Sequence, residues 1–203
     1  MCSSDLETGV LDRDTYEKRN NEFYDQYKAG TLNILEFLDF QLKPLAQYPR
    51  AVLDQWHGVY MQKKIHPMMR DSARALVARH AGDVRVMITA TNSFVTAPIA
   101  RLFGIEHLIA TEPEQKNGQF TGGVSGQPCF KEGKPARLRA WLAARGETLQ
   151  SYGKSWFYSD SHNDLPLMSL VSDPVAVDPD GKLRAHALAA GWPVMSLNAS
   201  PTP

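Results

Sequence analysis

Residues 155–168 constrain what this chain can fold into more than any other stretch of its sequence. The aromatic run at residues 156–158 is typical of a buried strand, and apolar side chains return at helical spacing from Leu165 onwards. Residues 159–164, between these two segments, are all polar. In an open α/β sheet, a turn that joins a strand to a helix lies at the carboxyl edge, where ligands bind. The stretch therefore predicts a strand, a turn and a helix, with a candidate ligand site at the turn.

The predicted turn contains two carboxylates, Asp160 and Asp164, separated by residues with hydroxyl, imidazole and amide side chains. Oxygen ligands of this kind can hold a hard divalent cation. Ser, Asp and Asn also favour ordinary surface turns, in which their side chains hydrogen-bond the local backbone. The stretch alone leaves a cation site and a capped surface turn as alternatives.

The composition of the chain excludes several classes of function. Lys plus Arg and Asp plus Glu both total 22, so the net charge is zero, and no dense basic run suggests a nucleic-acid surface. No apolar stretch approaches the roughly 20 residues that span a membrane. The two cysteines, Cys2 and Cys129, make neither a disulfide framework nor a metal knuckle. We expect a cytoplasmic protein with no nucleic-acid or membrane partner; the oligomeric state cannot be read from the sequence.

The first part of the chain has a helical pattern. We expect residues 1–8 to be a non-native start, because they match neither a helix nor a strand. Residues 9–67 contain three helical segments, which end near Gly30, Pro44 and Pro67 and predict a small helical domain. A fourth helical segment, residues 68–80, begins the second predicted domain, residues 68–203.

Strand and helix patterns alternate in the second predicted domain, which favours a doubly wound, mainly parallel α/β sheet. Asn117 and Gly118 are the signal of a hairpin turn. The predicted strands are residues 84–88, 107–110, 155–158, 174–177 and 192–195, and the predicted helices are residues 94–103, 134–145 and 182–190.

The turn predicted at residues 89–93 is a second candidate for chemistry. Its hydroxyl side chains and the free N–H groups of the helix that follows can bind an anion. The same side chains also serve as ordinary helix caps, which is the alternative reading. The candidate anion-binding residues are Thr89, Ala90, Thr91 and Asn92.

Lys134 is the third candidate, at the predicted start of a helix. A cation there opposes the helix dipole, so the position makes better sense beside a bound anion, although a solvated lysine is the alternative. Thr89, Lys134 and the two carboxylates would together bind a phosphate group, neutralise its charge and hold a cation. This set suits phosphoryl transfer, in which positioning and charge stabilisation carry most of the catalysis.

In order and spacing, Thr89 after an apolar strand, then Lys134, then Ser-Asp-Ser-His-Asn-Asp at residues 159–164 resembles three motifs of the haloacid dehalogenase superfamily. The similarity is to the phosphoserine-phosphatase-like branch. It implies a Rossmann-like α/β core with a helical cap formed by residues 9–67. It also implies a Mg²⁺-dependent phosphomonoester hydrolase that acts on a small phosphorylated substrate through an aspartyl-phosphate.

The resemblance also implies roles for individual residues. Thr89 and Lys134 would hold the phosphoryl group, and Asp160 and Asp164 would bind Mg²⁺ and complete the catalytic set. The implied substrate-binding residues are Thr89, Ala90, Thr91, Asn92, Lys134 and Asn163.

The first motif of that family, a strand followed by D-x-D-x-T, is absent from the sequence. Asp12 and Asp14 do not replace it, because only Val10 and Leu11 precede them as apolar residues. The absent strand would lie between the strands that carry Thr89 and Asp160. We therefore expect this polypeptide to have low stability and no turnover. The alternative function is a non-catalytic phospho-ligand or protein-binding module on the same fold.

Overall fold

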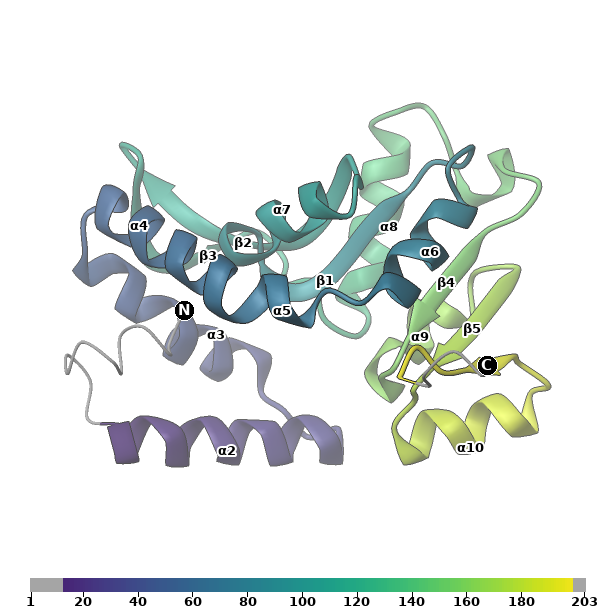
Figure 1. The fold of residues 1–203 in the computed structure, drawn as a ribbon, viewed down its shortest axis with the longest axis horizontal. Helices are drawn as coiled ribbons and strands as arrows, with labels where there is room; N and C mark the ends of the chain where they lie inside the picture. Colours follow the sequence, from purple (N-terminus) through teal and green to yellow (C-terminus); the bar gives the residue numbers. More distant parts are fainter. Residues whose placement is uncertain (1–12, 199–203) are drawn as a thin grey trace.

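The computed structural model describes residues 13–198, so the start expected to be non-native lies outside the described residues. Figure 1 shows strands and helices arranged as two sheets with helices around them. One sheet has the order β1–β2–β3, and the other has the order β4–β5–β6. The strand pairs β1–β2, β4–β5 and β5–β6 are parallel, whereas β2–β3 is antiparallel. The predicted α/β class with mainly parallel strands is therefore confirmed.

The bounds of the strands agree with the predicted order and differ in length. They are β1 (Val86–Asn92), β2 (His107–Lys116), β3 (Gln119–Ser125), β4 (Trp156–Ser159), β5 (Asp173–Val177) and β6 (Val194–Met195).

Two of these strands are longer than the sequence predicted. The expected end of β2 at residue 110 is wrong, because the strand continues into the predicted Asn117–Gly118 hairpin, where both residues have positive φ angles. The expected turn at residues 89–93 is also too long. β1 continues to Asn92, and its register against β2 shifts between Thr89 and Asn92. The β-branched threonines of this segment are compatible with an irregular strand as well as with a turn.

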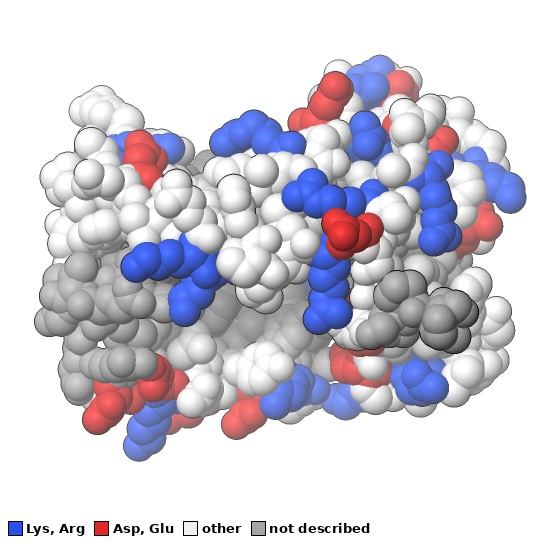
Figure 2. Space-filling view, viewed as in Figure 1, with Lys and Arg blue, Asp and Glu red and all other residues white. Residues whose placement is uncertain are grey.

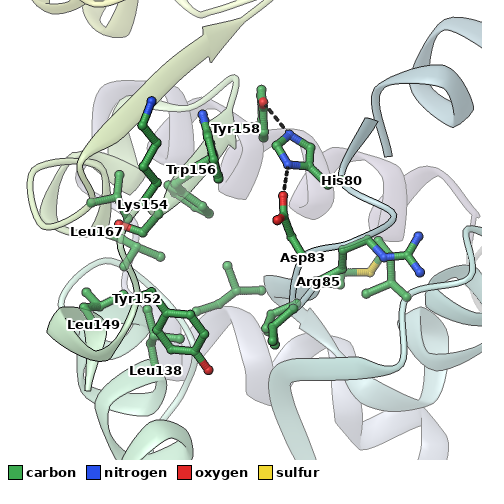
Figure 3. Close-up of a pocket in the computed structure, with 18 of the residues that line it drawn as sticks. His80, Asp83, Arg85, Leu138, Leu149, Tyr152, Lys154, Trp156, Tyr158 and Leu167 are labelled. Carbon is green, nitrogen blue, oxygen red and sulfur yellow. Dashed lines mark hydrogen bonds and ion pairs between the residues drawn. The ribbon is translucent and has the colours of Figure 1, made fainter. Parts of the chain in front are cut away.

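β1 and β4 lie at the facing edges of the two sheets. Among the described residues, the hydrogen-bonded neighbour of β1 is β2, and that of β4 is β5. Between them lies a cleft of about 600 Å³, whose walls carry Leu138, Trp156 and Leu167 (Figure 3). The two sheets are therefore separated by open, largely apolar space.

The helices of the second part of the chain connect these strands. Helix α7 begins directly after β1, because the Asn92 side chain accepts a hydrogen bond from the Val95 amide at 3.1 Å and so caps the helix. The helical segments are α7 (Ser93–Leu102), α8 (Gly133–Ala143), η3 (Leu149–Ser151), η4 (His162–Asp164), α9 (Leu165–Met168) and α10 (Gly181–Ala189).

The first part of the described chain is helical, as its pattern predicted. Gly30, with a φ of +79°, terminates the first helix at the expected position. None of the described helices is both long and apolar enough to cross a membrane. Figure 2 shows basic and acidic side chains interspersed on one face. The segments are α2 (Arg13–Ala29), α3 (Ile34–Leu42), η1 (Lys43–Gln47), α4 (Arg50–Tyr60), the π-helical η2 (Met61–Ile65), α5 (His66–Met68) and α6 (Asp71–Arg79).

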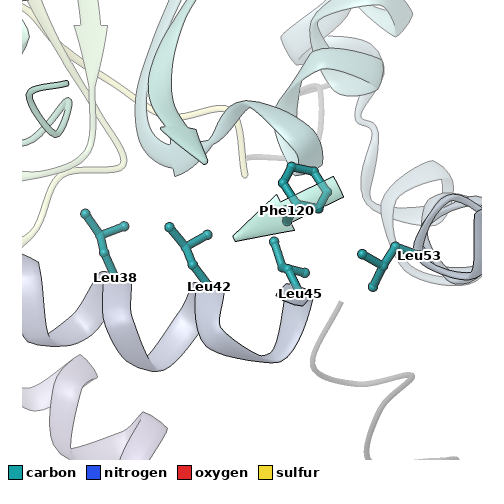
Figure 4. Close-up of a cluster of buried hydrophobic side chains, with 5 residues drawn as sticks. All are labelled: Leu38, Leu42, Leu45, Leu53 and Phe120. Carbon is teal, nitrogen blue, oxygen red and sulfur yellow. The ribbon is translucent and has the colours of Figure 1, made fainter. Parts of the chain in front are cut away.

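A cluster of buried side chains attaches the helical part to the hairpin formed by β2 and β3. Each leucine removed from water in this way contributes about 1.5–3 kcal/mol to stability. An apolar core therefore holds the helices on the sheet, and Ile34 and Phe37, which pack against it, also line the cavity described below. The cluster consists of Leu38, Leu42, Leu45, Leu53 and Phe120 (Figure 4).

Candidate active site

The carboxyl ends of β1 and β4 meet at a single cavity of about 450 Å³. Ile88 of β1 and Phe157 of β4 line both this cavity and the cleft between the sheets. Residues that precede them in each strand line the cleft, and residues that follow line the cavity. Both strands therefore run in the same sense and bring their polar ends together. The polar or small residues that the α/β part of the chain contributes to the cavity are Thr89, Ala90, Thr91, Lys134, Ser159, Asp160 and Asp164.

A buried ion pair forms the centre of this group. Lys134 Nζ lies 2.5 Å from Asp164 Oδ1, and both residues are only 7% exposed. The second oxygen of Asp164 accepts a hydrogen bond from Ser159 Oγ at 2.7 Å. A charge at this depth is stable only when it is paired and hydrogen-bonded. The reading of Lys134 as a solvated surface lysine is therefore wrong.

Gly133 fixes the backbone that carries Lys134. A Cβ atom on Gly133 would lie 2.1 Å from the carbonyl oxygen of Pro128, so no other residue fits without displacing the backbone. This close approach sets the start of α8 directly under the cavity. The sequence contained the signal, a glycine immediately before a helical lysine, but the sequence alone did not assign it a role.

Asp160 is the carboxylate that remains open to solvent at the cavity. The cavity walls nevertheless desolvate it. This desolvation and the neighbouring carboxylates of Asp164 and Asp180 raise its pKa above the usual range, with Lys134 acting in the opposite direction. A bound cation would relieve the same repulsion. The electrostatics of Asp160 therefore fit a cation ligand.

The remaining ligands available for a cation are few. The described residues contain no group of three or more His, Cys, Asp or Glu side chains arranged to hold a metal. Asp164 already contacts Lys134 and Ser159. Mg²⁺ commonly binds through one or two carboxylates together with water and substrate phosphate. The donor set of Asp160 and Asp164 fits that mode, and it does not fit an all-protein metal cage.

The carboxyl end of α2 is attached to the site by polar contacts. Tyr27 Oη donates to Ser161 Oγ at 2.7 Å, and Asn163 Nδ2 donates to the Tyr27 carbonyl at 3.1 Å. Lys131 and Lys182 donate from Nζ to the carbonyls of residues 30 and 29 at 2.7 and 2.8 Å. Cationic donors satisfy the free carbonyls of a helix end and complement its dipole. These contacts hold the helical wall of the cavity against its core.

Asp180 positions the loop that carries Asp160. Its Oδ2 accepts from the His162 amide and lies 2.8 Å from His162 Nδ1, and its Oδ1 caps α10 through the Leu183 amide. Burial tends to raise the pKa of Asp180, but hydrogen bonds from His162 and Leu183 lower it overall. A charged Asp180 therefore orders the loop through His162, whereas Lys134 holds it through Asp164.

The structure gathers most of the candidate residues but separates two of them. Thr89, Ala90, Thr91, Lys134, Asp160 and Asp164 line the cavity, whereas Asn92 and Asn163 are not among its lining residues. Asn92 is buried and caps α7. Asn163 is buried against α2 through the Tyr27 carbonyl, so its predicted contact with substrate stays a prediction.

Sequence reasoning missed Tyr27 and the serines around Asp160. Tyr27 and Ser161 are 134 positions apart, and nothing in either local pattern indicates that they touch. Ser159 and Ser161 lay inside the recognised polar stretch, where the alternation of hydroxyl and carboxylate side chains was the available signal.

Comparison of the sequence with known proteins identifies a family. Residues 6–169 match the haloacid dehalogenase-like hydrolase family. A histidinol-phosphatase of Neisseria meningitidis serogroup C (strain 8013) is 47% identical over 195 residues, which are 95% of this chain and 88% of that protein.

Solved structures have the same fold. A protein of unknown function from Bordetella pertussis Tohama I is 42% identical and superposes with a TM-score of 0.87, covering 94% of this chain and 87% of that one. A substrate-bound phosphoserine phosphatase is similar in fold, with a TM-score of 0.63 and 17% identity over 95% of this chain and 82% of that one. The chain belongs to the haloacid dehalogenase-like hydrolase family.

Proposed function

We propose that the cavity at the ends of β1 and β4 binds the phosphoryl group of a small phosphomonoester together with Mg²⁺, as part of a phosphatase of this family. The observation that carries the proposal is the convergence of Thr89, Lys134 and Asp160 on one cavity from three distant parts of the chain. A hydroxyl, an ammonium and a carboxylate supply a hydrogen bond, a positive charge and a cation ligand. Positioning a phosphoryl group and neutralising its charge require this combination, and turnover through an aspartyl-phosphate would also need a carboxylate that attacks phosphorus.

Each residue has a distinct role in this proposal. Thr89 donates to a phosphoryl oxygen, and Lys134 neutralises charge on the same group while it holds Asp164 in place. Asp160 is the ligand that holds Mg²⁺, with Asp164 in support. When bound, Mg²⁺ would draw charge from the phosphoryl oxygens and help to orient the group.

The helical wall of the cavity indicates the kind of leaving group. The residues that α2 and α3 contribute are uncharged, and they include Phe23, Tyr24, Tyr27 and Phe37. Aromatic walls favour a planar group, neutral or cationic, because such groups stack on ring faces. This supports histidinol phosphate, the substrate in the name of the Neisseria relative, over a substrate whose leaving group carries a carboxylate.

We further propose that this polypeptide binds the phosphoryl group but does not turn it over. Asp160 and Asp164 are the carboxylates that line the described cavity, and both have assigned roles as cation ligands or ion-pair partners. No further cavity carboxylate among the described residues is free to attack phosphorus. The alternative function is a non-catalytic phospho-ligand or protein-binding module on the same fold, and its phospho-ligand form makes the same binding prediction.

Binding of vanadate, a phosphate mimic, tests the proposal directly. We expect saturable vanadate binding by calorimetry that requires Mg²⁺ and is lost in Asp160→Asn. The matched control is Asp25→Asn, on the exposed face of α2, which should bind like the wild type. Binding that ignores Mg²⁺, or that survives Asp160→Asn, would overturn the phosphoryl site. Mg²⁺-dependent hydrolysis of p-nitrophenyl phosphate would overturn the absence of turnover while leaving the site intact.

A further inference from the structure

Tyr27 joins the helical wall of the cavity to the loop that carries Asp160 and Asp164. Its ring lines the cavity. Its hydroxyl donates to Ser161 Oγ at 2.7 Å, and its carbonyl accepts from Asn163 Nδ2 at 3.1 Å. Ser161 directly follows Asp160, and Asn163 directly precedes Asp164. A single residue of α2 therefore contacts the loop beside each of its two carboxylates.

The buried side chains of the loop have no other support. Ser161 and Asn163 are only 4% and 2% exposed, so their polar atoms must find partners within the protein. Over the part of the chain that the structure describes, these two side chains hydrogen-bond only to each other's residue and to Tyr27. Tyr27 is therefore the hydrogen-bond partner that they have outside the loop.

The hydroxyl of Tyr27 also reinforces a helix cap. Ser161 Oγ accepts from the Asn163 amide at 3.2 Å and so caps η4, the short turn that ends at Asp164. The phenol donates to the same oxygen. Burial raises the pKa of Tyr27 above its usual range, although its bond to Ser161 acts in the opposite direction. The phenol is therefore a neutral donor at physiological pH.

The backbone around Tyr27 is itself held in place. Lys131 and Lys182 donate from Nζ to carbonyls at the end of α2. Lys131 does so from a φ of +45°, a conformation that residues with a Cβ atom adopt only where their surroundings fix it. A Cβ atom on Gly30 would lie 3.0 Å from His162 Nε2, so the end of α2 packs directly on the loop. Tyr27 thus supports the loop from a fixed base.

We propose that Tyr27 is a positioning residue of the phosphoryl site. It acts through Ser161 and Asn163, and it thereby keeps the adjoining carboxylates directed at the cavity, where Mg²⁺ binds. This role rests on the proposed function, because it concerns the same cation and the same phosphoryl group. Without the Tyr27 hydroxyl, part of the binding energy of Mg²⁺ is spent on ordering the loop, so a higher Mg²⁺ concentration is needed.

Tyr27→Phe tests this role, because it removes the hydroxyl and keeps the ring and the carbonyl. We expect the Mg²⁺ concentration for half-maximal vanadate binding to rise roughly three- to tenfold, the equivalent of one net hydrogen bond. Without any ligand, the amides of residues 161–164 should exchange about threefold faster or more. Tyr152→Phe is the matched control: it loses a phenol hydrogen bond of the same length, to Glu147, outside the cavity, and should change neither quantity.

A double-mutant cycle with Ser161→Ala identifies the contact. Ser161→Ala alone should raise the Mg²⁺ requirement, and it provides the test if Tyr27→Phe does not fold. Adding Tyr27→Phe to Ser161→Ala should then have little further effect, because the shared hydrogen bond is already lost. Fully additive effects of the two substitutions would overturn the proposal.

The same measurements separate positioning from a purely structural role. A structural hydroxyl would lower the Tm of Tyr27→Phe and leave its Mg²⁺ requirement unchanged, which would overturn the proposal. Unchanged amide exchange of residues 161–164 in Tyr27→Phe would overturn it as well, whatever the protein binds. Wild-type protein that binds no vanadate in the presence of Mg²⁺ would instead overturn the proposed phosphoryl site itself.

Discussion

β5 and β1 are both parallel strands of apolar sequence, and they differ in what lies beside them. β5 is paired on both sides, by β4 and β6, and its central residues Pro174, Val175 and Ala176 are buried. β1 is paired by β2 alone, and Val86, Met87 and Ile88 are half-buried although they are at least as apolar. Local sequence therefore does not decide burial here. A second neighbour decides it, and β1 and β4 each lack one among the described strands.

This difference divides the molecule into a well-packed part and an incomplete one. The sheet that contains β5 packs on fully buried side chains, including Met168, Leu183 and Ala187. The facing edges of β1 and β4 border the cleft. The polar site lies where the two parts meet. We therefore expect the packed part to set the global stability and the edges to open more easily.

The largest expected effect concerns the ion pair that joins the two parts. Lys134→Ala leaves Asp164 buried without its cationic partner, so we expect the free energy of unfolding to fall by about 3–5 kcal/mol. Lys154→Ala, at an exposed lysine on the cleft rim, should change it by less than about 0.5 kcal/mol. Urea unfolding measures both. Equal effects would show that the pair does not link the two regions.

A pair of leucine truncations compares the two regions directly. Leu183 is fully buried against β5, so Leu183→Ala should cost about 2–5 kcal/mol. Leu138 lines the open cleft, so Leu138→Ala removes fewer contacts and should cost roughly 1 kcal/mol or less. Urea midpoints of the two variants provide the measurement. Similar losses would mean that the cleft is closed in solution.

Much of this division could be predicted from the sequence, and some could not. The alternation of strand and helix, the hairpin at Asn117 and the polar turn around Asp160 each follow from local patterns. Helix capping was one of two readings of the segment around Asn92, and the hydrogen bond from the Val95 amide to the Asn92 side chain identifies that residue as a cap. Contacts such as Tyr27 with Ser161 join segments far apart in sequence, so no local pattern contains them.

Amide hydrogen exchange should show the difference in local stability between β5 and β1. Amides of β5 should exchange only through global unfolding, whereas those of Val86–Ile88 in β1 should also exchange through smaller openings. The expected low stability should appear in the same sample as a thermal transition at or below the 45–65 °C range of ordinary mesophile domains. A cooperative transition well above it, with β1 and β5 equally protected, would contradict the division.

The smallest expected effect is a pH dependence at the junction. Because the folded protein raises the pKa of Asp160, the folded state binds that proton more tightly than the unfolded state. This contribution is present below the ordinary pKa of about 3.9 and is lost as the pH rises through the raised value. Without Mg²⁺, Asp160→Asn should thus be slightly more stable than the wild type at pH 7, and the difference should shrink towards pH 4. Asp25→Asn is the matched control, and an advantage that grows towards pH 4 would reverse the assigned sign.

The central claim is that residues from β1, α8 and the turn after β4 share one magnesium-bound phosphoryl group. A crystal structure of the 203-residue chain grown with Mg²⁺ and vanadate tests it most directly. We predict vanadate in contact with both Thr89 and Lys134, and Mg²⁺ on Asp160 beside it. Vanadate bound elsewhere, or a structure in which these three side chains do not face one cavity, would contradict the account.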